Sequence, residues 1–152
     1  MKQESGRSLI EIIGVMAIAG MMMVGTIAAY NMIRSNQART VATAELEQIV
    51  EDTKILMEMT GSYEGISINY LIKAGALKSD RPPIGGTDWS INASADNLSF
   101  AINLVDLTAS ECEYFAEKQP RWASAILING FETGVTTNCF DSTTNQISFI
   151  VE

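Results

Sequence analysis

Residues 7–34, RSLIEIIGVMAIAGMMMVGTIAAYNMIR, decide how this chain is built. The 22 positions between Glu11 and Arg34 contain no Asp, Glu, Lys or Arg. At a helical rise of about 1.5 Å per residue they span roughly 33 Å, which is enough to cross the hydrocarbon core of a bilayer. A buried core helix of this length would be unusually long and apolar on every side. We therefore expect a transmembrane helix over about residues 12–33.

A conventional secretory signal peptide is the alternative for this segment. Its apolar region usually runs about 7–15 residues and ends in small residues before a cleavage site. Thr26-Ile27-Ala28 is a weak candidate for such a site. The apolar run is longer than a signal peptide needs, and Glu11 lies near its start, so a transmembrane helix is favoured.

Glu11 is a carboxylate at the edge of the apolar run. A charge at the centre of a membrane costs about 2.5–3.5 kcal/mol on insertion scales, and less near the end of a helix. Arg7 lies four residues earlier on the same helical face and is a candidate partner within the chain, although the cation-first order is the less favourable one. Glu11 therefore calls for a partner, in its own chain or in another.

The start of the chain, Met-Lys-Gln-Glu-Ser-Gly followed by Arg7-Ser8-Leu9-Ile10-Glu11, resembles the N-terminus of type IV pilins and their relatives. The resemblance implies that a leader, residues 1–6, is cut after Gly6 on the cytoplasmic side by a prepilin peptidase. Arg7 then becomes the N-methylated first residue, where the family most often has Phe or Met, and Glu11 becomes the fifth. In an apolar surrounding a paired charge is tolerated better than a lone one. Glu11 is thus expected to meet the terminal amine of Arg7 in a neighbouring subunit and to set the axial register of assembly.

The helix is expected to continue to about residue 60, with Thr60-Gly61 as its stop. Its second part is amphipathic: apolar or small residues recur at helical spacing, and acidic residues occupy the other positions. This face comprises Ala38, Ala42, Leu46, Ile49, Thr53 and Leu56. A coiled-coil seam is the alternative, but the repeat covers only about three heptads, so packing under a head domain is favoured.

Residues 61–152 are expected to form an α+β head. The expected helices are 67–74 and 108–118, the latter with a capping box of Thr108 and Glu111. The expected strands are 87–92 and 98–107, joined as a hairpin, and 124–129 and 146–151. Asn129-Gly130 is a tight-turn signal.

Cys112 and Cys139 are the chain's two cysteines. An even pair in a chain with an export segment favours a disulfide, with two buried thiols as the alternative. The C-terminal third also resembles the type IVb pilins, the subgroup of bundle-forming, toxin-coregulated and thin conjugative pili. The matching residues are Leu107, Cys112, Trp122, Asn129-Gly130, Cys139 and Asn145. This resemblance implies an antiparallel sheet packed on the upper half of the long helix, with the disulfide fastening the C-terminal region.

Composition excludes several classes of function. The chain has no histidine, which removes His-based triads and His-ligated metal sites. Its net charge of -8 argues against nucleic acid as a partner. Asp106, Glu111 and Glu113 are a candidate carboxylate pair of a membrane-anchored enzyme, but such spacing is more typical of a solvated face. The sequence therefore predicts no catalytic residue, no cofactor and no metal site.

The resemblance implies a structural subunit of a type IVb-like pilus. Such a subunit is processed by a prepilin peptidase, held in the bacterial inner membrane, and assembled by the pilus machinery into a helical filament of identical subunits at the cell surface. A minor pilin or a type II secretion pseudopilin is the alternative within this class. A secreted binding module with a conventional signal peptide is the alternative from another class. Adhesion, conjugation and secretion all remain open.

Overall fold

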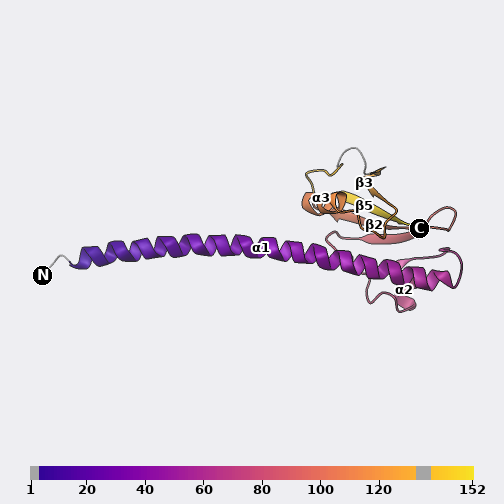
Figure 1. Cartoon of the computed structure of the whole chain (residues 1–152), viewed down its shortest axis with the longest axis horizontal. Helices are drawn as coiled ribbons and strands as arrows, with labels where there is room; N and C mark the ends of the chain where they lie inside the picture. The colour runs from indigo at the N-terminus through magenta and orange to yellow at the C-terminus, as the bar shows by residue number, and fades with distance from the viewer. Residues whose placement is uncertain (1–3, 133–137) are drawn as a thin grey trace. The chain divides into compact units, whose positions relative to one another are not determined.

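The computed structural model describes residues 4–132 and 138–152, with side chains from residue 10 onward. The chain divides into two units, one up to Ala38 and the other from Arg39 to Glu152. The described elements follow the order α1 (Glu4–Glu58), α2 (Ile68–Lys73), β1 (Trp89–Ala93), β2 (Phe100–Leu107), α3 (Ala109–Glu117), β3 (Ala125–Ile128), β4 (Phe131–Glu132) and β5 (Asn145–Val151) (Figure 1).

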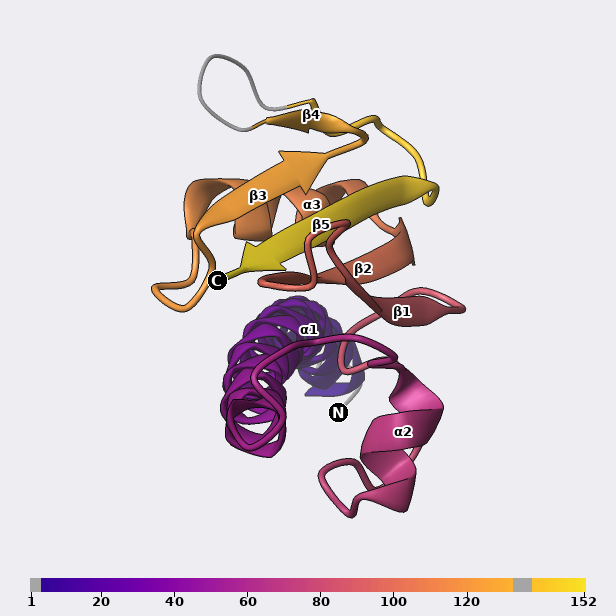
Figure 2. The same ribbon diagram turned by 90° about the vertical axis from the view of Figure 1, so that its right-hand side faces the viewer.

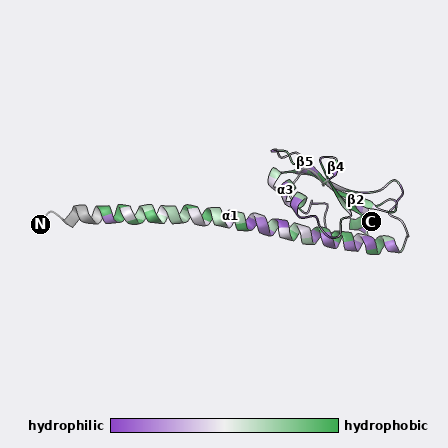
Figure 3. Cartoon of the chain, turned by 45° about the horizontal axis from the view of Figure 1, so that its top comes forward, coloured by the Kyte–Doolittle hydropathy of each residue, from purple (hydrophilic) through white to green (hydrophobic). Residues whose placement is uncertain are grey.

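Helix α1 contains the apolar run and the amphipathic segment in one continuous element, as expected. Its first part is predominantly apolar, whereas polar residues alternate with apolar ones in its second part (Figure 3). The helix ends at Glu58, and the N–H of Gly61 donates to the carbonyl of Met57 at 2.9 Å. Gly61 has a φ of 73°, the left-handed conformation that glycine adopts readily after a helix. The Thr60-Gly61 stop is therefore confirmed.

The strands form one antiparallel sheet in the order β1-β2-β5-β3-β4 (Figure 2). The hairpin β1–β2 and the strands β3 and β5 match the expected strands to within two residues at each end. The two-residue strand β4 was not expected; it pairs with β3 across the Asn129-Gly130 turn. Placing β5 between β2 and β3 joins strands that are far apart in the sequence.

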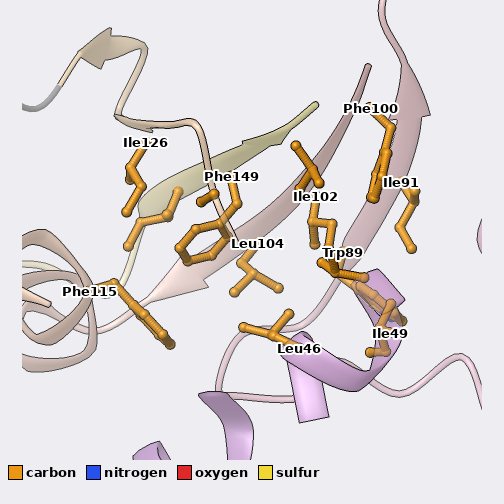
Figure 4. Close-up of a cluster of buried hydrophobic side chains, with 14 of the residues drawn as sticks. Leu46, Ile49, Trp89, Ile91, Phe100, Ile102, Leu104, Phe115, Ile126 and Phe149 are labelled. Carbon is orange, nitrogen blue, oxygen red and sulfur yellow. The ribbon is translucent and has the colours of Figure 1, made fainter. Parts of the chain in front are cut away.

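One face of the sheet packs on the second part of α1 and on α3 (Figure 4). Leu46 and Ile49 of α1 belong to the same buried cluster as Phe115 of α3 and the inward-facing side chains of the strands. The buried side of α1 comprises Ala42, Leu46, Ile49, Val50, Thr53 and Met57. Packing under a head is thus confirmed. The expected face is slightly displaced, because Ala38 is exposed and Leu56 is only half-buried.

Local capping signals place the two short helices. Ser67 accepts a hydrogen bond from the backbone N–H of Tyr70 at 3.2 Å and caps α2. Thr108 and Glu111 form the expected capping box at the start of α3, in which the Glu111 carboxylate accepts from the Thr108 N–H at 2.9 Å. The capping box was expected because its two residues lie three positions apart in the sequence, whereas the Ser67 cap was not named from the sequence.

Candidate functional site

The apolar segment of α1, residues 10–33, has none of its residues buried. Its large apolar side chains are between 57% and 78% exposed, from Ile12 and Ile33 to Met21. Soluble monomers rarely expose a continuous apolar surface of this extent. By length and composition the helix is able to cross a membrane, although a signal sequence near an N-terminus passes the same test.

The hydroxyl groups of Thr26 in this segment and of Ser35 just beyond it are satisfied within the helix. The Thr26 hydroxyl donates to the carbonyl of Met23 at 2.9 Å, and the Ser35 hydroxyl just beyond the segment donates to the carbonyl of Met32 at 2.9 Å. Such bonds remove the need for water around a hydroxyl group in lipid. Between Glu11 near its start and Tyr30-Asn31 near its end, the segment therefore presents an apolar surface.

Glu11 lies at the start of this segment and is exposed. At helical spacing it shares a face with Val15, Ile18 and Met22, which are exposed as well. Gly6 and Arg7 belong to α1, but the side chain of Arg7 lies outside the described part of the structure, as do residues 1–3 of the expected leader. Leader cleavage between Gly6 and Arg7, methylation of Arg7 and its pairing with Glu11 therefore stay predictions.

The two cysteines form a disulfide. Cys112 lies on α3 and is fully buried, and Cys139 lies shortly before β5, with the two Cα atoms 5.8 Å apart. No free cysteine remains, so the alternative of two buried thiols is wrong. The bond ties α3 to the segment that leads into the central strand β5.

Asn145, at the start of β5, is fully buried and joins several segments near this bond. Its side-chain amide donates to the carbonyls of Leu107 at 3.2 Å and Phe140 at 3.0 Å. Its side-chain oxygen accepts from the Phe140 N–H at 2.7 Å and from the Asn129 amide at 3.1 Å. The sequence pattern named Asn145 and Asn129 without showing that they touch, and no local signal distinguishes Asn145 from the polar residues on either side of it.

The other residues of the C-terminal pattern are structural too. Trp122 packs against Phe149 of β5 with their ring centroids 5.2 Å apart. Asn129 and Gly130 have φ values of 51° and 86°, as a tight hairpin turn between β3 and β4 requires. The pattern thus describes how the C-terminal part of the head is fastened together.

Arg39, at the start of the second unit, links α1 to α3. Its guanidinium donates to the Ser110 hydroxyl at 2.8 Å and lies 5.6 Å from the centre of the Tyr114 ring. The Lys118 ammonium lies 5.2 Å from the centre of the same ring. Cations are attracted to the face of an aromatic ring at such distances. In the sequence Arg39 was visible only as a positive charge, because no local pattern joins it to Ser110, 71 positions away.

The three candidate carboxylates are occupied or exposed. Glu111 caps α3, Asp106 accepts a hydrogen bond from the Thr87 hydroxyl, and Glu113 is exposed. The shifted pKa values lie elsewhere in the head. Burial, and then the neighbouring Glu58 carboxylate, raises the pKa of Tyr63, whereas a hydrogen bond from Ser94 lowers the pKa of Asp96. Among the described residues, no group of three or more Cys, Asp or Glu side chains is arranged to hold a metal ion.

Comparisons by sequence find no match: no family profile fits the chain, and no curated protein is similar to it. The structure is similar to the crystal structure of TcpA, a type IV pilin from Vibrio cholerae El Tor biotype. The two are 15% identical with a TM-score of 0.60, and the match covers 76% of this chain and 99% of the other. The two chains thus share a fold despite the low identity. The chain has the fold of a type IV pilin.

Proposed function

We propose that this chain is the structural subunit of a type IVb-like pilus. The observation that carries the proposal is the unburied apolar segment of α1, residues 10–33, on a chain that has the fold of a type IV pilin. The C-terminal pattern around Asn145 and the Cys112–Cys139 disulfide supports the type IVb subgroup, because these residues together fasten the C-terminal region.

In this proposal the apolar segment first crosses the inner membrane and later packs against the same segment of other copies. A prepilin peptidase removes residues 1–6, which leaves residues 7–60 as the long helix and 61–152 as the head. The new amine of Arg7 is methylated. Extraction by the pilus machinery then replaces lipid with neighbouring helices, so the hydrophobic surface stays covered throughout.

Glu11 gives this assembly its register. A charged amine or carboxylate in an apolar filament core is costly when alone and tolerated when paired. Glu11 of one subunit therefore meets the amine of Arg7 in the next, and a different stagger leaves both charges without partners. The result is a helical filament of identical subunits at the cell surface.

Sequencing the N-terminus of the mature protein tests this proposal first. Processing after Gly6 gives a protein that begins at Arg7, with the mass of a methyl group added at its amine. A protein that begins at Ala29 identifies a conventional signal peptide, and one that begins at Met1 removes the basis for the Glu11 pairing. The amount of the chain in sheared filaments then separates a major subunit from a minor pilin or a secretion pseudopilin.

A further inference from the structure

Eight outward-facing positions in the middle of the sheet, two on each of four strands, carry no charged side chain. Because side chains alternate between faces, the register defines this open face as two rows. One row is Ser90, Asn103, Ser148 and Leu127, and the other is Asn92, Ala101, Ile150 and Ala125. None of the eight is buried. The charges on this face lie at its two edges, with Asp88 beside the β1 end and Glu132 opposite Leu127 on β4.

A groove of about 320 Å³ lies on this face at the β1 side. Its polar lining residues are Asp88, Ser90, Asn92, Asn103 and Gln146, and Trp89 and Val105 complete it. The volume falls within the range of small-molecule sites, about 300–1,000 Å³. The lining contains three carboxamides, one hydroxyl and one carboxylate, and no cation.

Hydrogen bonds within β1 and one between β2 and β1 orient most of the polar groups of the groove. The side-chain amides of Asn92 and Asn103 both donate to the Ser90 hydroxyl, at 3.0 Å and 3.2 Å. The Asp88 carboxylate accepts from the Trp89 N–H at 2.8 Å through one of its oxygens. A site on paired strands is held more rigidly than one on loops. The groove therefore presents its donors and acceptors in a set arrangement.

We propose that this groove binds a neutral saccharide. Each carboxamide has two N–H donors and an oxygen with two lone pairs. In Asn92 and Asn103 the bond to Ser90 uses one of these donors. A sugar hydroxyl is both a hydrogen-bond donor and an acceptor. Adjacent hydroxyls can therefore bond to the side-chain amides of the groove and donate to the Asp88 carboxylate. A phosphate, sulfate or sialic acid finds no cation in the lining and meets the charge of Asp88.

The proposal rests on the proposed function only for the affinity of binding; the kind of ligand follows from the lining of the groove. Trp89 is only 4% exposed, so its ring offers no broad stacking surface and a single groove binds weakly. A filament of identical subunits repeats the groove along its length. Linked copies raise the overall affinity by about 10²–10⁴ without any new contact.

Binding to neoglycoproteins tests the chemistry. The probes are albumin conjugates of galactose, glucose, mannose and N-acetylglucosamine, with a sialic acid conjugate and bare albumin as controls, and the full chain is presented in detergent micelles. We expect saturable binding to at least one neutral conjugate, competed by the free sugar and weakened at least tenfold by the double change Asn92→Ala and Asn103→Ala. The matched control is Gln48→Ala, which removes an exposed amide from α1 and should leave binding unchanged. Tryptophan fluorescence confirms that each variant is folded.

Three results would overturn the proposal: no neutral conjugate binds better than bare albumin, the sialic acid conjugate binds best, or the double variant binds like the wild type. The proposal is also overturned if the wild type binds no saccharide and the double variant forms no filaments. That result would identify the open face as a contact between subunits. Failure of the proposed function is distinguishable, because binding in micelles needs no filament. A chain that binds sugar but begins at Ala29 after processing rejects the pilus alone.

Discussion

Asn145 shows what one residue contributes to this head. A buried carboxamide is costly unless its groups are paired, and here its amide donates to three backbone carbonyls, those of Leu107, Phe140 and Ser142. Its oxygen accepts from the Phe140 N–H and the Asn129 amide. The residue type was visible in the sequence, but its partners were not, because Leu107 lies 38 positions away.

Replacing Asn145 with Ala should destabilise the head strongly. The change leaves the buried Leu107 carbonyl and the partly buried backbone groups of Phe140 and Ser142 without this partner. A buried group left unpaired costs about 1–3 kcal/mol and a partly buried one less, so a total loss of about 2–4 kcal/mol is expected. Urea unfolding of the full chain in micelles, followed by tryptophan fluorescence, measures this loss, because both tryptophans, Trp89 and Trp122, lie in the head. The control Asn92→Ala, at an exposed position, should change stability by less than about 0.5 kcal/mol. Equal midpoints for Asn145→Ala and the wild type contradict the role given to Asn145.

Glu11 decides whether filaments form, in our proposal. Glu11→Gln keeps a polar side chain of the same size, so the helix should insert into the membrane as before. Each neighbouring amine then lacks its counter-charge in the filament core, a loss that costs about 3–5 kcal/mol for a buried pair. Immunoblots of sheared and membrane fractions should show a normal membrane pool and no filaments. Glu45→Gln, at an exposed position of the same helix, serves as the control. Normal filament yield from Glu11→Gln would reject the pairing.

At the scale of elements, prediction succeeded where the signal is local. Thr108 with Glu111 before α3 and Gly61 after α1 each act within one turn of the helix they bound. The hairpin β1–β2 was recognisable from alternation on both sides of a polar loop. The strand β4 was not, because its two residues are too few for a pattern and it depends on its partner β3.

The cap of α3 provides a test at this scale. The Thr108 hydroxyl accepts from the Glu111 N–H, and Glu111 accepts from the Thr108 backbone N–H. Thr108→Ala removes the first of these two bonds and keeps the backbone donor of the second. We expect a loss of about 1 kcal/mol in the free energy of unfolding, the usual effect of removing a threonine cap. The same urea titration measures it, with Thr143→Ala, an exposed loop position, as the control. A loss equal to that of the control would show that tertiary packing through Phe115 and Cys112, rather than the cap, holds α3 in place.

At the scale of the molecule, the sequence predicted the split into an apolar N-terminal helix and an acidic head better than it predicted the order of the strands. The charge balance of +2 over residues 1–40 and -10 over residues 41–152 follows from 4 basic and 2 acidic residues in the first part and 6 basic and 16 acidic in the second. The strand order β1-β2-β5-β3-β4 depends on pairings between distant segments, which no local pattern encodes. The saccharide groove was invisible for the same reason: Ser90, Asn103 and Gln146 become neighbours only once β1, β2 and β5 are in register.

The disulfide tests how the C-terminal region holds the head together. It closes a loop over a separation of 27 residues, which contains β3 and β4 and leads into β5. A cross-link over such a loop stabilises the folded state by about 3.5 kcal/mol if it acts by restricting the unfolded chain. The double change Cys112→Ala and Cys139→Ala should therefore lower the urea midpoint strongly, and the reduced wild type should fall by nearly the same amount. A much larger loss in the double variant than in the reduced wild type assigns the effect to packing around the buried Cys112. No loss in either shows that the Asn145 network alone fastens this region.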